Sequence, residues 1–170
     1  MGRLSTKENK LPYHLRREEL GLSREEASVL LDWIPPERIE RIENEKSDPL
    51  PEEIVAMAEA YKEPMLCNYY CANQCPIGKR YVPEVKVKDL SQIVLEMLAS
   101  LNSAKREQEK LIEITADGKI EGDEIKDFVR IQNELEKISL AVETLQLWSE
   151  SMLANGAIDI EAYQEYKKNL

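Results

Sequence analysis

The residues best suited to chemistry are the three cysteines and the single histidine of the chain. Cys67, Cys71 and Cys75 follow one another at steps of four residues. A helix turns once about every 3.6 residues, so this spacing places the three side chains along one helix face. Thiolates on one face form a partial cage for Zn²⁺ or an iron–sulfur cluster, and His14 is available as a fourth ligand. These four residues are the predicted metal site.

Two other roles for the cysteines stay open. Structural zinc sites usually place two residues between paired cysteines, and the spacing here is longer. Free thiols are among the most buried side chains, so the segment is also compatible with a short helix packed between two modules. Neighbouring cysteines can also act as a redox switch. The alternatives to a metal site are therefore buried packing or a thiol sensor.

The segment Glu113–Glu124 aligns in length with a calcium-binding EF-hand loop. Gly118 and Glu124 fall in register, but the first and third positions are Glu113 and Thr115, where Asp or Asn ligands are required. A turn at Asp117 and Gly118, followed by an acidic first helical turn, accounts for the same residues. Calcium is not expected. Neither a Gly-rich phosphate loop nor a catalytic group of side chains is apparent, so the sequence does not predict an enzyme.

Residues 11–63 contain the patterns of four short helices. Pro12, Pro36 and Pro51 each suit the first turn of a helix, because proline lacks the N–H group that such a position leaves unbonded. Ser23 and Glu26 form the pattern of a capping box, with the two residues three positions apart. The four patterns therefore predict a compact helical module that ends near residue 63.

This module resembles the Cro/lambda-repressor type of helix-turn-helix, the XRE family of regulators. The resemblance covers about residues 11–63 and is carried by Leu15-Arg16-Arg17-Glu18-Glu19-Leu20-Gly21-Leu22-Ser23, Glu25-Glu26, Ile39, Arg41-Ile42-Glu43-Asn44 and Pro49. In that family the second and third helices dock on DNA, with the third helix in the major groove. The resemblance implies a DNA-facing set made of Ser23, Arg24, Glu37, Arg38, Glu40, Arg41, Asn44 and Lys46.

The charge of the same region favours a second interpretation. The net charge is −10, and residues 1–63 and 64–170 each contribute −5, so neither part is basic. Glu37, Glu40 and Glu45 stand where a DNA-reading module would carry Gln, Ser or Gly, and Asp32 replaces the usual turn Gly. A glutamate repels phosphate and pairs only with cytosine. The alternative is a protein-interaction adaptor that keeps the repressor fold without binding DNA.

The second half of the chain carries two long amphipathic patterns. Apolar residues recur at alternating steps of three and four, as in a coiled coil: Leu90, Val94, Met97, Leu101, Ala104 and Leu111, then Phe128, Ile131, Leu135, Ile138, Val142, Leu145 and Met152. The short connection, about residues 115–122, predicts an antiparallel hairpin. Because one hairpin cannot bury two broad apolar faces, the pattern predicts a bundle or a homodimer.

The predicted fold is therefore all-α, with a four-helix module at 1–63, a cysteine-containing connector at 64–87, and a hairpin with a short final helix at 88–170. No apolar run is long enough to span a membrane, and residues 1–10 lack the core of a signal peptide, so a cytoplasmic location is expected. The predicted function is a DNA-binding transcriptional regulator that dimerises through its C-terminal helices. A protein partner remains the alternative to DNA.

Overall fold

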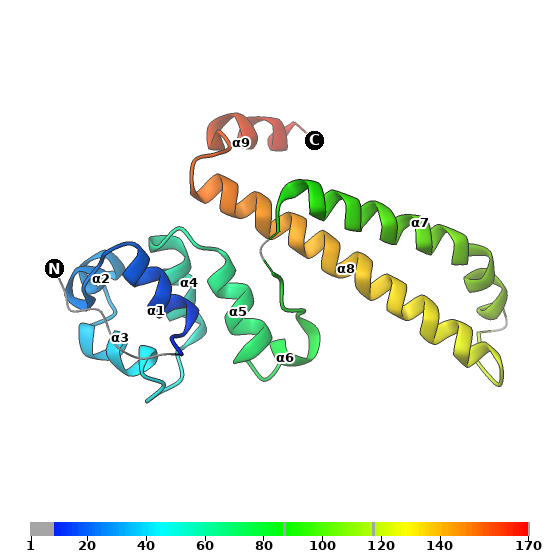
Figure 1. Ribbon diagram of the computed structural model, residues 1–170, viewed down its shortest axis with the longest axis horizontal. Helices are drawn as coiled ribbons and strands as arrows, with labels where there is room; N and C mark the ends of the chain where they lie inside the picture. Colours follow the sequence, from blue (N-terminus) through cyan, green and yellow to red (C-terminus); the bar gives the residue numbers. More distant parts are fainter. Residues whose placement is uncertain (1–8, 87, 117, 170) are drawn as a thin grey trace. The chain divides into compact units, whose positions relative to one another are not determined.

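The computed structural model describes residues 9–86, 88–116 and 118–169. Within these ranges the chain is helical and contains no strand, which confirms the predicted all-α class (Figure 1). The helices are α1 (Pro12–Glu19), α2 (Arg24–Leu31), α3 (Pro36–Glu43), α4 (Pro51–Ala60), α5 (Met65–Asn73), α6 (Gly78–Tyr81), α7 (Leu90–Ile114), α8 (Glu124–Ala154) and α9 (Ile160–Lys168). The helix-turn-helix module lies at the N-terminus and the long helices follow it, as predicted.

The chain divides into two compact units. The described residues of 1–84 and 150–170 belong to the first unit, and those of 85–149 belong to the second. The first unit has one apolar core, to which α1–α5 all contribute. Its buried members are Tyr13, Ala27, Leu31, Ile34, Ile39, Ile42, Ile54, Met57, Ala58, Tyr61 and Leu66. Because Leu66 is one of them, the first turn of α5 is part of this core.

The start of each short helix follows from local chemistry. Pro occupies the first turn of α1, α3 and α4, as predicted. The Ser23 hydroxyl accepts the N–H of Glu26, and the Glu26 carboxylate accepts the N–H of Ser23, so the predicted capping box opens α2. At the start of α4 the carboxylate of Glu53 accepts the N–H of Leu50. These contacts bond N–H groups that the helices leave without an internal partner.

Three of the first four helices end in the same left-handed turn. Gly21 follows α1 with a φ of 71°, Glu45 follows α3 with a φ of 58°, and Lys62 follows α4 with a φ of 53°. After α3, the N–H of Lys46 donates to the carbonyl of Arg41, and the N–H of Glu45 donates to that of Ile42. This bonding satisfies the last carbonyls of the helix. Only the first of the three turns uses glycine, the residue that adopts a positive φ at least cost.

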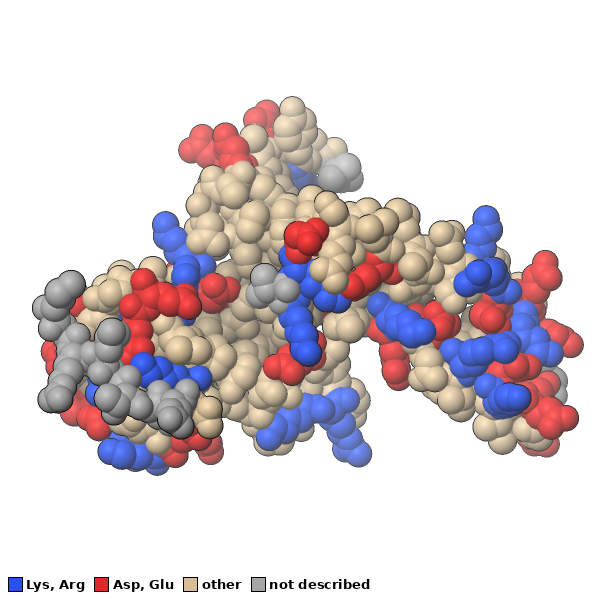
Figure 2. Space-filling view, in the orientation of Figure 1, with Lys and Arg blue, Asp and Glu red and all other residues tan. Residues whose placement is uncertain are grey.

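The second unit is an antiparallel hairpin of α7 and the part of α8 within it. Lys110 lies 3.6 Å from Asp127, and Glu107 lies 2.8 Å from Arg130. One turn further along, the Ser103 hydroxyl donates to the Glu134 carboxylate. Successive pairs move toward the start of α7 and toward the end of α8 by equal steps, as in two antiparallel helices. Figure 2 shows Lys and Arg mixed with Asp and Glu at the tip of the hairpin.

The hairpin buries only part of the predicted apolar stripes. On α8, Ile131 is 4% exposed, whereas Leu135 and Val142 on the neighbouring column of the stripe are each 50% exposed. The buried residues of α7 are Ile93 and Ile114, which lie beside the predicted stripe and not in it. Leu101, which belongs to the stripe, is 46% exposed. A single hairpin therefore leaves apolar side chains of both helices accessible to solvent, Leu101 on α7 and Leu135 and Val142 on α8.

The final helix α9 is capped by Asp159, whose carboxylate accepts the N–H groups of Glu161 and Ala162. It has no buried residue: Ile160 is 52% exposed and Tyr166 is 75% exposed. Among the described residues, no helix has the length and apolarity required to cross a bilayer.

Candidate nucleic-acid interface

The helix pair α2–α3 is joined by a short, strained turn. Asp32, which follows α2, adopts a φ of 62° and a ψ of −59°. The N–H of Trp33 donates to the carbonyl of Leu31 at 2.7 Å, which closes a three-residue γ-turn of the rare positive-φ kind. Ile34 is then buried, and Pro35 precedes the first turn of α3. The Gly that the resemblance expects at Asp32 would adopt this backbone conformation more readily.

A buried ion cluster fixes α3 against α1 and α2. Glu43, on the inner face of α3, is 1% exposed. Arg17 of α1 donates to both of its oxygens, at 2.5 and 2.9 Å, and Arg24 of α2 donates to one of them at 2.9 Å. His14 Nε2 lies 3.7 Å from the same carboxylate. A carboxylate shared by two guanidinium groups sets the position of α3 through directional bonds, which apolar contacts alone do not supply.

A second buried carboxylate, that of Glu53, holds the first turn of α3. Glu53 of α4 is 3% exposed and accepts two hydrogen bonds from the guanidinium of Arg38, both at 2.6 Å. Arg38 also donates to the Ser47 hydroxyl at 2.7 Å and to the Asp48 carbonyl at 2.9 Å. The pKa of Glu53 lies below its ordinary value: burial opposes the shift, and the bonds from Arg38 and from the Leu50 N–H outweigh it. The side chain of Arg38 is thus engaged within the module.

The solvent-facing side of α3 carries a mixed set of charges. Glu37 and Arg41 are exposed, and Arg41 makes no ion pair or hydrogen bond through its side chain among the described residues. Glu40 lies 3.4 Å from both the Lys46 ammonium and the Asn44 amide. Arg41 is therefore the accessible cation of this face, whereas Lys46 is partly neutralised by its neighbour.

The eight residues predicted to face DNA thus divide into two groups. Ser23, Arg24 and Arg38 make contacts that hold the helices in place. The others, Glu37, Glu40, Arg41, Asn44 and Lys46, lie on or directly after the outer side of α3. Sequence reasoning missed the structural acids, Glu43 and Glu53. The available signal was helical register: Glu43 stands four positions after buried Ile39, and Glu53 stands four positions before buried Met57.

The predicted metal site is not assembled. Helix α5 ends at Asn73, so Cys67 and Cys71 share a helix whereas Cys75 lies in the turn after it and accepts the N–H of Gly78 at 3.4 Å. His14 is fully buried and bonds Glu18 at 3.1 Å. In the described parts of the chain no three His, Cys, Asp or Glu residues are grouped to hold a metal ion. Burial raises the pKa of Cys67 and Cys71, which favours the neutral thiol.

The fold and the pairing of α2 with α3 define a helix-turn-helix domain. Residues 14–66 match the family model described as Helix-turn-helix. The match confirms the Cro/lambda-repressor-type module predicted for residues 11–63 and supports a DNA-binding regulatory domain. Comparisons with the curated proteins and with the solved structures found no match.

Proposed function

We propose that this protein is a transcriptional regulator that docks α2 and α3 on duplex DNA and dimerises through its α7–α8 hairpin. The observation that carries the proposal is the helix-turn-helix domain itself, with an exposed Arg41 on the outer side of α3. An arginine at this place can donate two hydrogen bonds to a guanine in the major groove. Lys46 lies where a phosphate contact would be made. Arg24 bonds Glu43 through Nε only, so its other N–H groups can donate to a second phosphate, and Ser23 and Asn44 flank the two cations.

Arg38 takes a positioning role in this proposal. Its guanidinium is already bonded to Glu53, Ser47 and Asp48, so reaching a base would require breaking a buried ion pair. The clamp instead fixes α3 relative to α4. Arg41 is then the residue proposed to contact a base. Its neighbours Glu37 and Glu40 repel phosphate, and among the bases their carboxylates can accept a hydrogen bond only from cytosine.

The affinity for DNA is expected to be low, with a modest dependence on salt. The net charge of the protein is −10, so it offers few unpaired Lys and Arg side chains to replace the counterions of DNA. Pairing of two half-sites by a dimer would add to the weak contacts of one module. With two phosphate contacts, Lys46 and Arg24, binding of mixed-sequence duplex should weaken by about tenfold for each docked module between about 50 and 200 mM salt.

The experiment measures fluorescence anisotropy of a labelled mixed-sequence duplex across this range of salt. Arg41→Ala should cost about 1–3 kcal/mol and relax the preference at one base position, whereas Lys46→Ala should weaken all sequences alike and lower the salt slope by about one. Lys126→Ala, which removes an exposed cation from the hairpin, is the matched control and should leave the affinity unchanged.

A gain-of-function variant makes the test independent of weak native binding. The double substitution Glu40→Ser and Glu45→Gly removes two carboxylates and frees Lys46 from Glu40. Because Glu45 has a positive φ, glycine also suits its backbone. This variant should bind DNA more tightly than the native chain. If neither protein binds any duplex at low salt, the regulator proposal fails and the protein-adaptor interpretation replaces it.

Dimerisation is proposed from the half-buried hairpin. The exposed columns of the two stripes contain Leu101 on α7 and Leu135 and Val142 on α8. Leu135 and Val142 stand one heptad apart on α8, which suits packing against a second copy of the same hairpin. Burying such leucine and valine side chains stabilises a contact by roughly 1.5–3 kcal/mol each when burial is complete.

A further inference from the structure

Helix α6 belongs to a cationic segment of an otherwise acidic protein. Residues 64–83 contain no Asp or Glu, whereas the whole chain has 33 acidic residues in 170. The cations of the segment are Lys79 and Arg80, and both are exposed. Among the described residues, neither side chain makes an ion pair or a hydrogen bond. Figure 2 shows Lys and Arg gathered at the lower edge of the first unit, where α6 lies in Figure 1. The segment therefore offers two positive charges that an anionic partner can neutralise.

The position of α6 is fixed by its contacts with α5. A Cβ atom at Gly78 would lie 2.1 Å from the carbonyl oxygen of Cys71, so the two backbones touch. The N–H of Val82 donates to the Gly78 carbonyl at 2.7 Å and closes the turn. The Asn68 amide donates to the Pro83 carbonyl at 3.0 Å, which ties the chain after α6 back to α5. Because the backbone is held in this way, little ordering is required when a partner binds.

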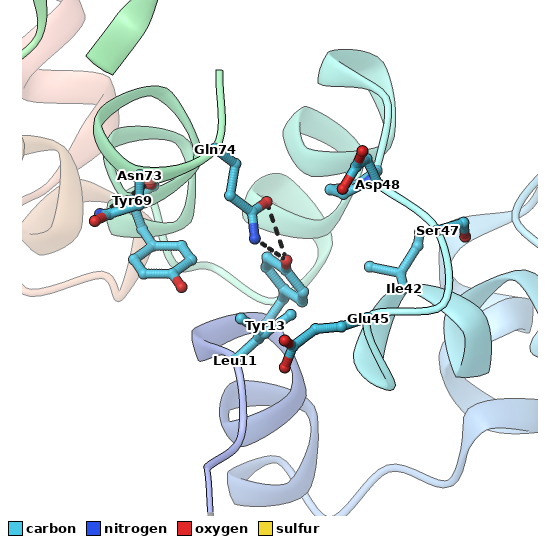
Figure 3. A pocket seen from close by; sticks show the side chains of 10 residues that line it. Leu11, Tyr13, Ile42, Glu45, Ser47, Asp48, Tyr69, Asn73 and Gln74 are labelled. Atoms are coloured by element: carbon cyan, nitrogen blue, oxygen red, sulfur yellow. Dashed lines mark hydrogen bonds between the residues drawn. The ribbon is translucent and has the colours of Figure 1, made fainter. Parts of the chain in front are cut away.

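The contact with α5 also brings α6 near the loop between α3 and α4. Figure 3 shows Gln74, directly after α5, and Ser47 of that loop around one hollow. Lys79 follows Gln74 by five residues, and even a fully extended chain of that length spans only about 17 Å. Lys46, which is proposed to contact phosphate, precedes Ser47 directly. The cations of α6 therefore lie near the loop that follows the DNA-facing helix.

The side chains of this segment suit the phosphates of duplex DNA. Lys, Arg and Tyr are among the residues that contact DNA phosphates, and Lys79, Arg80 and the 74% exposed Tyr81 supply one of each. Glu45 and Asp48 of the neighbouring loop repel phosphate, and the two cations of α6 offset that repulsion. An anionic membrane is a poorer match, because segments that bind one cluster about four to eight Lys and Arg residues.

We propose that α6 is a second DNA-contacting element, in which Lys79 and Arg80 neutralise phosphates beside those that α2 and α3 contact. The inference rests on the proposed regulator function, since the DNA is the duplex that α3 binds. It adds two phosphate contacts to those of Lys46 and Arg24, which makes four for each docked module. Phosphate contacts carry no sequence information, so α6 strengthens binding to all sequences alike.

The salt dependence of DNA affinity counts these contacts. Fluorescence anisotropy of a labelled mixed-sequence duplex, measured with the full chain, gives the affinity between about 50 and 200 mM salt. The contacts of α2 and α3 alone predict a loss of about tenfold for each docked module, and four contacts predict a loss of roughly a hundredfold. A loss near tenfold overturns the role of α6 and leaves the regulator function intact. If no duplex binds at low salt, the regulator function fails and the role of α6 fails with it.

Substitutions assign the contacts to α6. The double substitution Lys79→Ala and Arg80→Ala should weaken binding at about 50 mM salt by at least about tenfold, and should reduce the loss across the salt range to about tenfold. The matched control is Lys105→Ala with Arg106→Ala, an exposed Lys-Arg pair on α7, which should bind DNA like the native chain. Equal affinity and salt dependence of the native chain and the α6 variant overturn the proposal.

NMR spectra of the native chain test the place of contact without any substitution. The backbone amide signal of Gly78 should shift when duplex is added, because it lies directly before the two cations. Vesicles of phosphatidylglycerol serve as the anionic control and should leave this signal in place. A Gly78 signal that shifts with the vesicles but not with the duplex would assign the segment to a membrane surface and overturn the proposal.

Discussion

At the scale of single residues, the central group of the first unit is Glu43. Two arginines share its carboxylate, and His14 reaches the same carboxylate from α1. His14 Nε2 also bonds Glu18, whereas His14 Nδ1 has no hydrogen-bond partner in the described structure. A neutral imidazole ring suits these contacts of His14, because protonation of Nδ1 would create a buried N–H donor without an acceptor.

The first prediction follows from this histidine. The pKa of His14 lies below its ordinary value of 6.5, above all because of burial, with Arg17 acting in the same direction and the carboxylates of Glu43 and Glu18 opposing. The unfolded chain therefore binds the proton more readily. The free energy of unfolding should fall as the pH falls below 6.5, by at most about 1.4 kcal/mol for each pH unit.

Urea denaturation at pH 7.5 and pH 5.5 measures this loss. Carboxylates such as Glu53, whose pKa is lowered from 4.5, lose their contribution only in more acidic solution, so the chosen window isolates the histidine. His14→Gln should be less stable at pH 7.5 but should vary less between the two pH values. An unchanged pH dependence in this variant would assign the effect to another group.

At the scale of elements, the contact between α5 and α6 depends on one glycine. A Cβ atom built at Gly78 would lie 2.1 Å from the carbonyl oxygen of Cys71, and 2.6 Å from its carbon. These are backbone atoms, which cannot move aside like the end of a flexible side chain. Helix α6 therefore approaches α5 closely only because residue 78 has no side chain.

Gly78→Ala is accordingly expected to lower the free energy of unfolding by about 1–3 kcal/mol, the usual cost of overpacking a close contact. Lys79→Ala, at the exposed neighbouring position of α6, should change it by less than about 0.5 kcal/mol. The urea midpoints of the two variants provide the comparison. Equal midpoints would show that α6 can move away from α5 at no cost.

At the scale of the whole molecule, the exposed apolar columns of the hairpin predict self-association. Light scattering should give a dimer mass at tens of micromolar protein, an ordinary range for stable association. The double substitution Leu135→Glu and Val142→Glu should give a monomer, because it places two charges in the proposed contact. Gln132→Glu adds a charge at an exposed polar position of the same helix and should leave the dimer intact.

A strictly monomeric native chain in that range would contradict the dimer. DNA binding could then still be tested through Arg41, because the proposed DNA contact and the proposed dimer are measured independently.

The sequence by itself determined the four helices of the N-terminal module and where they begin. Ser23 and Glu26 form the predicted cap, and proline opens the helices as expected, because these effects depend only on residues within one turn. The family resemblance identified the module for a similar reason, since its apolar positions repeat at fixed helical spacing. The antiparallel hairpin followed from two periodic stripes and a short connection.

Only the tertiary structure decided which charged side chains are available. Arg38 and Arg41 stand three positions apart on the same helix, yet Arg38 bonds buried Glu53 of another helix and Arg41 remains exposed. Likewise, the cysteine spacing suggested one helix face, but α5 ends at Asn73, before Cys75. Pairing between distant segments is set by packing in three dimensions. One-dimensional spacing therefore identified the elements but not the partners of Glu43 and Glu53.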